Sequence, residues 1–119
     1  MARERQWDAR IACVIELIAA NPQRGWTVAE LAAHVHLSTG QFRRLFTAEV
    51  GKSPIDYLRH DRLARAAHLL RSSHRRVSDI MRAVGISDPS HFARDFKAKF
   101  GTSPIEYRRL MTRVSSRTK

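Results

Sequence analysis

Residues 53–72 read SPIDYLRHDRLARAAHLLRS, and the rest of the chain is arranged around this stretch. Ser53 can cap the free backbone N–H groups of a helix start, and Pro54 stands where its missing N–H costs nothing. Apolar residues then recur at steps of three and four, while basic residues fill much of the remaining circumference. We therefore predict a long amphipathic helix over 53–72.

Nearly the same pattern lies on either side of this helix. Residues 28–59 read VAELAAHVHLSTGQFRRLFTAEVGKSPIDYLR, and residues 77–109 read VSDIMRAVGISDPSHFARDFKAKFGTSPIEYRR. The chain is a tandem duplication, and two repeats are too few for a solenoid, so we predict two similar modules joined by a shared helix. The matching positions are Leu31, Val35, Leu37, Phe42, Phe46, Gly51, Ser53, Pro54, Ile55 and Tyr57 in the first copy, and Ile80, Val84, Ile86, Phe92, Phe96, Gly101, Ser103, Pro104, Ile105 and Tyr107 in the second.

Each copy has the pattern of two short helices joined by a tight turn. In the first copy the helices are expected over 28–35 and 39–50, after an opening helix over 6–20 that stops at an Asn-Pro pair. Two short helices joined by a tight turn form a helix-turn-helix, whose second helix can lay its N-terminal residues in the major groove of DNA. We predict an all-α fold with about seven helices, organised as a helix-turn-helix subdomain over 6–52, a linker helix over 53–72, a second helix-turn-helix subdomain over 73–112 and a frayed basic tail over 113–119.

The charge of the chain restricts its partners. Lys and Arg number 22 against 11 Asp and Glu, which leaves a net charge of +11. Such an excess predicts attraction to a polyanion, either nucleic acid or an anionic membrane surface. No apolar run approaches the roughly 20 residues that span a bilayer, and the first ten residues lack the apolar region of a secretory signal. We expect a cytoplasmic, nucleoid-associated protein.

Residues that could support catalysis or hold a metal do not form a recognisable set. The single Cys13 excludes an internal disulfide and a multi-cysteine zinc site, and its helical spacing with Ile11 and Val14 predicts a buried, inert thiol. The six histidines do not pair with Cys, Asp or Glu at metal-ligand spacings, and no phosphate-binding loop or nucleophile motif is present. We therefore predict no catalytic residue, metal or cofactor, and a protein that is not an enzyme.

The second helix of each copy carries the candidate DNA contacts. Arg44 and Arg94 stand two residues after the repeated phenylalanine, and this repetition favours DNA binding over a merely solvated charged face. The candidates for contact with bases, or near them, are Thr39, Gln41, Arg43, Arg44, Ser90, His91 and Arg94. The candidates for contact with phosphate are Ser38, Thr47, Lys52, Ser87, Arg75, Arg76 and Lys97.

The downstream copy resembles the helix-turn-helix motif of the AraC/XylS family of bacterial transcription regulators. The likeness extends over residues 11–109, and two positions depart from it: the family usually has alanine where Met81 stands and phenylalanine where Ile86 stands. The residues that carry it are Ile80, Val84, Gly85, Ser87, Ser90, Phe92, Arg94, Phe96, Lys97, Gly101, Ser103, Pro104, Tyr107 and Arg108, with Arg62, Leu63, Ala66, Leu69 and Leu70 in the linker helix.

The resemblance implies sequence-specific binding to promoter double-stranded DNA and activation through contact with RNA polymerase. If the chain is complete, it is similar to the small single-domain members that act as monomers. If it is a fragment of a longer protein, the effector domain of that protein is missing from the fragment. A linker helix of this size is about 28 Å long. This length is close to the spacing of about 34 Å between successive major-groove faces on one side of a DNA duplex. Because the modules are duplicated along the chain, we expect two recognition helices in adjacent grooves of an asymmetric site.

Two other classes of protein share part of this pattern. A nonspecific architectural nucleic-acid-binding protein would be equally basic, and it predicts a steep salt dependence with little preference among sequences. A membrane-surface or protein-interaction module would also be basic and amphipathic, but internal packing uses the apolar faces here. Two copies of a shaped turn with matched arginines favour a sequence-specific transcription regulator over both.

Overall fold

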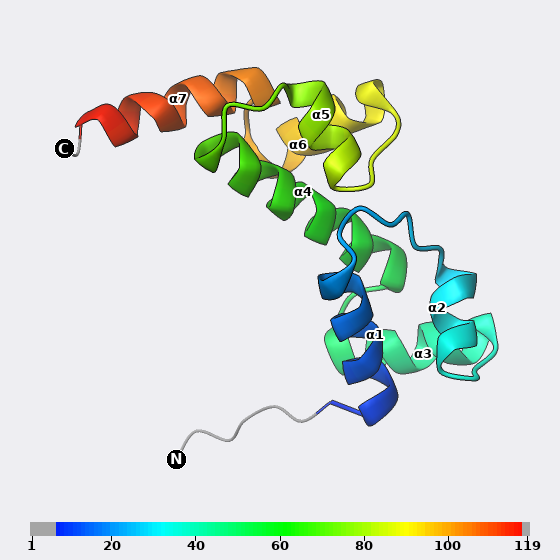
Figure 1. The fold of residues 1–119 in the computed structure, drawn as a ribbon. Helices are drawn as coiled ribbons and strands as arrows, with labels where there is room; N and C mark the ends of the chain where they lie inside the picture. The colour runs from blue at the N-terminus through cyan, green and yellow to red at the C-terminus, as the bar shows by residue number, and fades with distance from the viewer. Residues whose placement is uncertain (1–6, 118–119) are drawn as a thin grey trace, which may run out of the picture. The chain divides into compact units, whose positions relative to one another are not determined.

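The structure, a computed structural model, describes the backbone of residues 7–117 and the side chains of residues 7–112. The described residues form helices and loops without a strand, which confirms the predicted all-α class (Figure 1). The helices are α1 (Ala9–Ala20), α2 (Val28–His34), α3 (Thr39–Val50), α4 (Pro54–Ser72), α5 (Val77–Ala83), α6 (Pro89–Phe100) and α7 (Pro104–Arg117). None of these helices is long and apolar enough to cross a membrane.

Capping side chains fix where the helices begin. Thr27 and Glu30 form a reciprocal capping box at the start of α2. Ser53 and Ser103 accept hydrogen bonds from backbone N–H groups in the first turns of α4 and α7, each at 3.2 Å. At the other end of α3, Gly51 has φ of 86°, a left-handed conformation that glycine adopts without strain.

The first unit ends at Arg59 and has its own hydrophobic core. Helix α3 packs against α1 and α2 in this unit. Phe42 and Phe46 are fully buried, and the rings of Phe46 and Tyr57 meet edge to face with centroids 5.5 Å apart. The remaining buried members of the core are Ile11, Val14, Ile18, Trp26, Val28, Leu31, Ala32, Val35 and Leu58.

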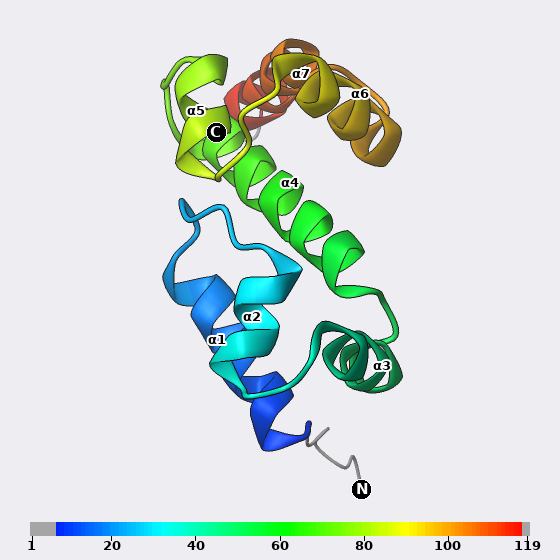
Figure 2. The same ribbon diagram turned by 90° about the vertical axis from the view of Figure 1, so that its right-hand side faces the viewer.

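The second unit begins at His60 and repeats the aromatic contacts of the first. Phe96 is fully buried, and its ring meets Tyr107 edge to face with centroids 5.3 Å apart. Helix α6 packs against α5 and α7, and Figure 2 shows these helices from a second side. Of the two departures from the family pattern, Met81 is buried in this core and Ile86 is partly buried and packs against it. The other buried members are Leu63, Ala66, Ala67, Leu70, Ile80, Val84 and Phe92.

The long helix α4 belongs to both units, whereas the sequence analysis treats 53–72 as a separate linker. Leu58, in its first half, is buried in the first core, and Leu63, in its second half, is buried in the second. The division between the units falls between Arg59 and His60. A single helix can serve two cores because it carries one set of apolar residues on each side of this division.

Three local predictions differ from the structure. Helix α1 begins at Ala9 because the Asp8 carboxylate caps it, and Gln6, the predicted start, lies outside the described residues. Cys13 is exposed, since it lies two residues from Ile11 and so points away from the buried face of the helix. Helix α7 continues to Arg117 where a frayed tail is predicted from residue 113, because no glycine or proline ends it; residues 118–119 lie outside the described residues.

The C-terminal end of α4 is capped by an arginine from α7. Arg108 donates from Nε to the carbonyl of Leu70 and from Nη2 to the carbonyl of Ser73, both at 3.2 Å. A guanidinium at this end satisfies carbonyls that the helix leaves without partners and opposes the negative end of the helix dipole. The equivalent position in the first copy is Leu58, which is buried, so the duplicated modules have diverged here.

Arg108→Ala is expected to lower the free energy of unfolding by about 2 kcal/mol, because two hydrogen bonds from a charged donor are lost. Chemical denaturation followed by circular dichroism measures this change. The neighbouring Arg109 is the matched control: it is exposed, and among the described side chains it pairs with Glu106 one turn away, so Arg109→Ala should change stability by less than about 0.5 kcal/mol. Equal losses in the two variants would contradict the capping role.

Candidate nucleic-acid interface

The outward face of α3 carries most of the polar residues that the sequence assigns to DNA contact in the first module. Phe42 and Phe46 anchor the opposite face in the core, which fixes the direction in which the polar side chains point. Arg43, Arg44 and Thr47 are exposed and line an open hollow together with Ala48. Ser38, Gln41 and Lys52 are exposed as well, while Thr39 is half-buried.

A capping box stabilises the start of α3, and one of its two residues, Gln41, is a candidate for contact with a base. The backbone N–H of Gln41 donates to Ser38 Oγ, and the backbone N–H of Ser38 donates to Gln41 Oε1, both at 3.1 Å. Ser38 is therefore the N-cap of α3. With its amide oxygen engaged in the cap, Gln41 keeps its amide nitrogen as the group that can donate to a base.

The outward face of α6 is the counterpart in the second module. Its candidate residues Ser90, His91, Arg94 and Lys97 are all exposed, and Ser87 is exposed in the preceding turn. Phe92 and Phe96 point into the core, as Phe42 and Phe46 do in α3. Helices α3 and α6 thus expose the same face of the duplicated motif.

Sequence reasoning did not single out Asp88, which caps α6. Its Oδ1 accepts from the backbone N–H groups of Ser90 at 2.9 Å and His91 at 3.2 Å, and its Oδ2 lies 3.5 Å from His91 Nδ1. These hydrogen bonds, with the nearby His91 and Arg94 side chains, lower the pKa of the Asp88 carboxyl. The duplication offered a signal for this cap. Asp88 stands four residues before Phe92, and Ser38, which caps α3, stands four residues before Phe42.

The amide signals of Ser90 and His91 are expected to titrate with Asp88. Because the pKa of Asp88 is lowered in the folded protein, its stabilising charge is present above the pKa of an unfolded aspartate. It is lost as the pH falls through the folded pKa, below about pH 4. Nuclear magnetic resonance should show both amide signals shifting in this range, while Gln41, capped by the neutral Ser38, does not.

The matched variant for this titration is Asp88→Asn, which keeps a good cap without an ionisable group. Both amide signals should lose their pH-dependent shift in this variant while α6 stays helical. A midpoint above that of an ordinary aspartate would contradict the assigned hydrogen bonds.

Most cations of the described side chains are engaged within the fold. Lys99 Nζ donates to the carbonyl of His60 at 3.1 Å, and Arg71 donates to the Tyr107 hydroxyl at 2.6 Å. Arg62 is half-buried, and burial lowers the pKa of its guanidinium. Ion pairs with aspartate or glutamate hold Arg10, Arg24, Arg59, Arg65, Arg82 and Arg109.

The other cations form no hydrogen bond or ion pair through their charged groups with the described part of the chain. They lie on α3, on α6, in the turn after α3 and in the loop between α4 and α5. All are exposed, and they are the same cations that the sequence analysis assigns to DNA: Arg43, Arg44, Lys52, Arg75, Arg76, Arg94 and Lys97.

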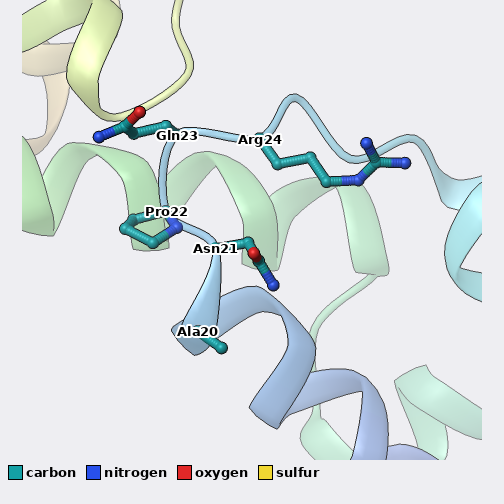
Figure 3. A pocket seen from close by; sticks show the side chains of 5 residues that line it. All are labelled: Ala20, Asn21, Pro22, Gln23 and Arg24. Atoms are coloured by element: carbon teal, nitrogen blue, oxygen red, sulfur yellow. The ribbon is translucent and has the colours of Figure 1, made fainter.

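A hollow elsewhere on the first unit lacks comparable groups. Asn21 Nδ2 donates to the carbonyl of Leu17 at 3.1 Å. The Arg24 guanidinium pairs with Glu30 at 2.7 Å and lies 4.1 Å from the centre of the Trp26 ring. These polar groups already serve the fold, so we assign no ligand to the hollow, which is lined by Ala20, Asn21, Pro22, Gln23 and Arg24 (Figure 3).

Known proteins are similar to this chain in sequence and in fold. A family model described as a helix-turn-helix domain matches residues 31–110, which include α3 and α6. The lactose operon transcription activator of Staphylococcus xylosus is 35% identical over 94 residues, which are 79% of this chain and 34% of that protein. A crystal structure of a Chromobacterium violaceum transcriptional regulator, described as having an AraC-type DNA-binding domain, has a TM-score of 0.78 at 28% identity and covers 87% of this chain and 92% of that chain.

The crystal structure of the DNA-binding domain of AdpA, a global transcriptional factor, in complex with a target DNA has a TM-score of 0.82 at 27% identity. The match covers 85% of this chain and 91% of that chain. This chain spans about a third of the length of the curated relatives it matches. These relatives are named as transcription regulators, not as enzymes.

Proposed function

We propose that this chain, which belongs to the AraC-type helix-turn-helix family of transcription regulators, reads a specific site on double-stranded DNA with α3 and α6. The observation that carries the proposal is the set of exposed cations on and around these two helices whose charged groups form no hydrogen bond or ion pair with the described residues. A polyanion can engage these charges without breaking any hydrogen bond or ion pair of the fold.

Arginine gives the recognition helices their capacity to read bases. A guanidinium can donate two parallel hydrogen bonds to the O6 and N7 atoms of guanine in the major groove. We assign this role to Arg44 and Arg94, which occupy the same position in the two copies of the motif. The other candidates support them: Thr39, Gln41, Arg43, Ser90 and His91 near the bases, and Ser38, Thr47, Lys52, Arg75, Arg76, Ser87 and Lys97 at the phosphates.

The duplication supports an asymmetric site. A palindromic operator mirrors the twofold axis of a dimer, whereas modules repeated along one chain follow each other in the same direction. One monomer would therefore insert α3 and α6 into adjacent major grooves and read two different half-sites. The sequences of α3 and α6 differ at most outward positions, such as Gln41 against His91 and Arg43 against Ala93, which fits two different half-sites.

We further propose that binding at a promoter in the bacterial cytoplasm activates transcription through contact with RNA polymerase. One of the relatives, the Staphylococcus xylosus protein, is named as a transcription activator, which supports this output. A reporter fused to the recovered DNA site should show higher expression when the chain is present. Lower expression would make the protein a repressor and leave the DNA-binding proposal unaffected.

Replacing Arg75 and Arg76 together with alanine is expected to weaken binding to every DNA sequence alike, because both residues are assigned to phosphate. The slope of log K against log salt concentration should become less negative by about 1.8, or about 0.9 for each lost contact. Arg82→Ala is the control, because Arg82 is exposed but paired with Asp79 at 3.4 Å. An unchanged slope in the double variant would remove this loop from the interface.

In-solution selection from a random duplex library tests the proposal against its architectural alternative. The pool is incubated with the protein at about 0.15 M salt, near the physiological ionic strength, and the recovered sequences are aligned without imposing symmetry. Strong enrichment of a nonpalindromic consensus is the expected result. A recovered pool as diverse as the starting library would overturn the proposal in favour of nonspecific binding.

A further inference from the structure

Gly40 occupies an exposed position in the first turn of α3, on the face that carries the candidate contacts. Glycine there is not explained by the fold. Its φ lies outside the left-handed region, and a Cβ placed on it would meet no backbone and no core side chain. Glycine destabilises a helix relative to alanine, so a glycine that neither conformation nor packing requires suggests a role for the empty space itself.

The space above Gly40 is bordered by Arg44. A Cβ at position 40 would lie 3.7 Å from Arg44 Nη1, which is its nearest neighbour. Side chains on a helix lean toward its N-terminus, so a residue covers the turn that precedes it. Arg44 therefore reaches back over the first turn of α3, and the missing side chain at position 40 leaves its guanidinium an open path there.

The second module keeps a small residue at the same place. Ser90 stands at the position of Gly40, and Arg94 at the position of Arg44. The rest of the first turn differs between the copies, with Thr39 and Gln41 in α3 and Pro89 and His91 in α6. A small residue four positions before the repeated arginine is therefore common to both helices, and both of these small residues are exposed.

We propose that Gly40 is a positioning residue for base reading: its missing side chain sets the path along which the Arg44 guanidinium reaches the DNA. This inference rests on the proposed function, in which Arg44 reads a base. A bulky side chain at position 40 would fill that path and force the guanidinium to leave the helix in another direction. A methyl group would be tolerated, because 3.7 Å is an ordinary van der Waals contact.

The test uses Gly40→Leu and Gly40→Ala, with Ala64→Leu as the matched control. Ala64 is exposed on helix α4 and belongs to none of the assigned DNA contacts, so Ala64→Leu adds similar bulk to a helix surface away from Arg44. Leucine and alanine are better helix formers than glycine, so a loss of binding would not come from unfolding. Affinity is measured on the selected DNA site and on variants of that site at the base pair that Arg44 reads.

Gly40→Leu is expected to weaken binding to the selected site about tenfold and to reduce the preference at the base pair read by Arg44, as a lost bidentate contact would. Gly40→Ala and Ala64→Leu should each change affinity less than about twofold, since neither blocks the guanidinium. In an Arg44→Ala background, Gly40→Leu should have less than about a twofold further effect, because it acts through that side chain.

Two results would overturn the inference and leave the proposed function standing. One is an unchanged base preference in Gly40→Leu when Arg44→Ala loses it. The other is an equal loss in Gly40→Leu and Ala64→Leu, which would mean that added apolar bulk on an exposed helix surface weakens binding wherever it stands. If Arg44→Ala itself keeps the affinity and base preference of the unmodified chain, the assigned role of Arg44 fails first, and the inference about Gly40 falls with it.

Discussion

Phe96→Ala is expected to lower the free energy of unfolding of the second unit by about 3 to 5 kcal/mol. The Phe96 side chain is fully buried, and its ring contacts those of Phe92, Phe100 and Tyr107. Removing it leaves a cavity among rigid rings that cannot collapse to fill the space. In the first unit, the corresponding Phe46→Ala should cost a similar amount, because Phe46 has equivalent contacts with Phe42 and Tyr57.

The tryptophans make it possible to measure the units separately. Trp7 and Trp26 both lie in the first unit, so tryptophan fluorescence follows that unit while circular dichroism follows the helices of both. Phe96→Ala should move the dichroism transition to lower denaturant and leave the fluorescence transition in place. Phe46→Ala should move the fluorescence transition itself. A fluorescence shift in Phe96→Ala as large as that in Phe46→Ala would show one cooperative core instead of two.

Replacing both Arg44 and Arg94 with alanine should cost about 2 to 6 kcal/mol of specific binding, since each bidentate contact with a base is worth about 1 to 3 kcal/mol and distant sites add. Each single variant should relax the preference at one base pair, in a different half of the selected site. Equilibrium titrations of the selected site and its single-base variants measure both effects. Affinity for unrelated sequences should fall much less than affinity for the selected site.

The exposed Arg82, which is paired with Asp79, again provides the control, because Arg82→Ala removes the same charge outside the proposed interface. If Arg44→Ala leaves affinity and preference unchanged, Arg44 does not read a base. If both single variants relax the same base pair, the two modules do not read separate half-sites.

Sequence repetition predicted most of the fold because the two copies support each other. Serine and proline at 53–54 and at 103–104 begin helices in both copies, and Phe46 and Phe96 fill equivalent core positions. Local signals of this kind, such as caps, apolar spacing and left-handed glycines, depend on neighbouring residues and so are visible in sequence.

The positions that sequence did not predict depend on the rotation of a helix about its axis, on its packing partners, or on a weak stop signal at its end. Cys13 shares a helix with the buried Ile11 and Val14, but its place on the circumference leaves it exposed. Helix α4 was predicted correctly as an element, yet only packing shows that its halves belong to different cores. The extension of α7 to Arg117 was missed because the composition of the last residues suggests an irregular tail.

The sequence predicts which residue types form the candidate site, but it does not show which arginines form ion pairs with acidic side chains. Sequence shows many arginines, and only the structure shows that Arg24 and Arg65 are held by acidic partners while Arg43 and Arg44 form no such pair with the described residues. The cap at Asp88 and the open space at Gly40 likewise depend on interatomic distances. A basic composition alone does not separate structural cations from those available to a partner.

Hydroxyl-radical footprinting of the unmodified chain on the selected DNA site tests the two-module proposal most directly. If α3 and α6 enter adjacent major grooves, two protected windows should lie about 10 base pairs apart. Protection of the two windows should weaken separately, one in Arg44→Ala and the other in Arg94→Ala. A single window confined to one half-turn, or equal loss of protection across the site in both variants, would contradict reading by two recognition helices.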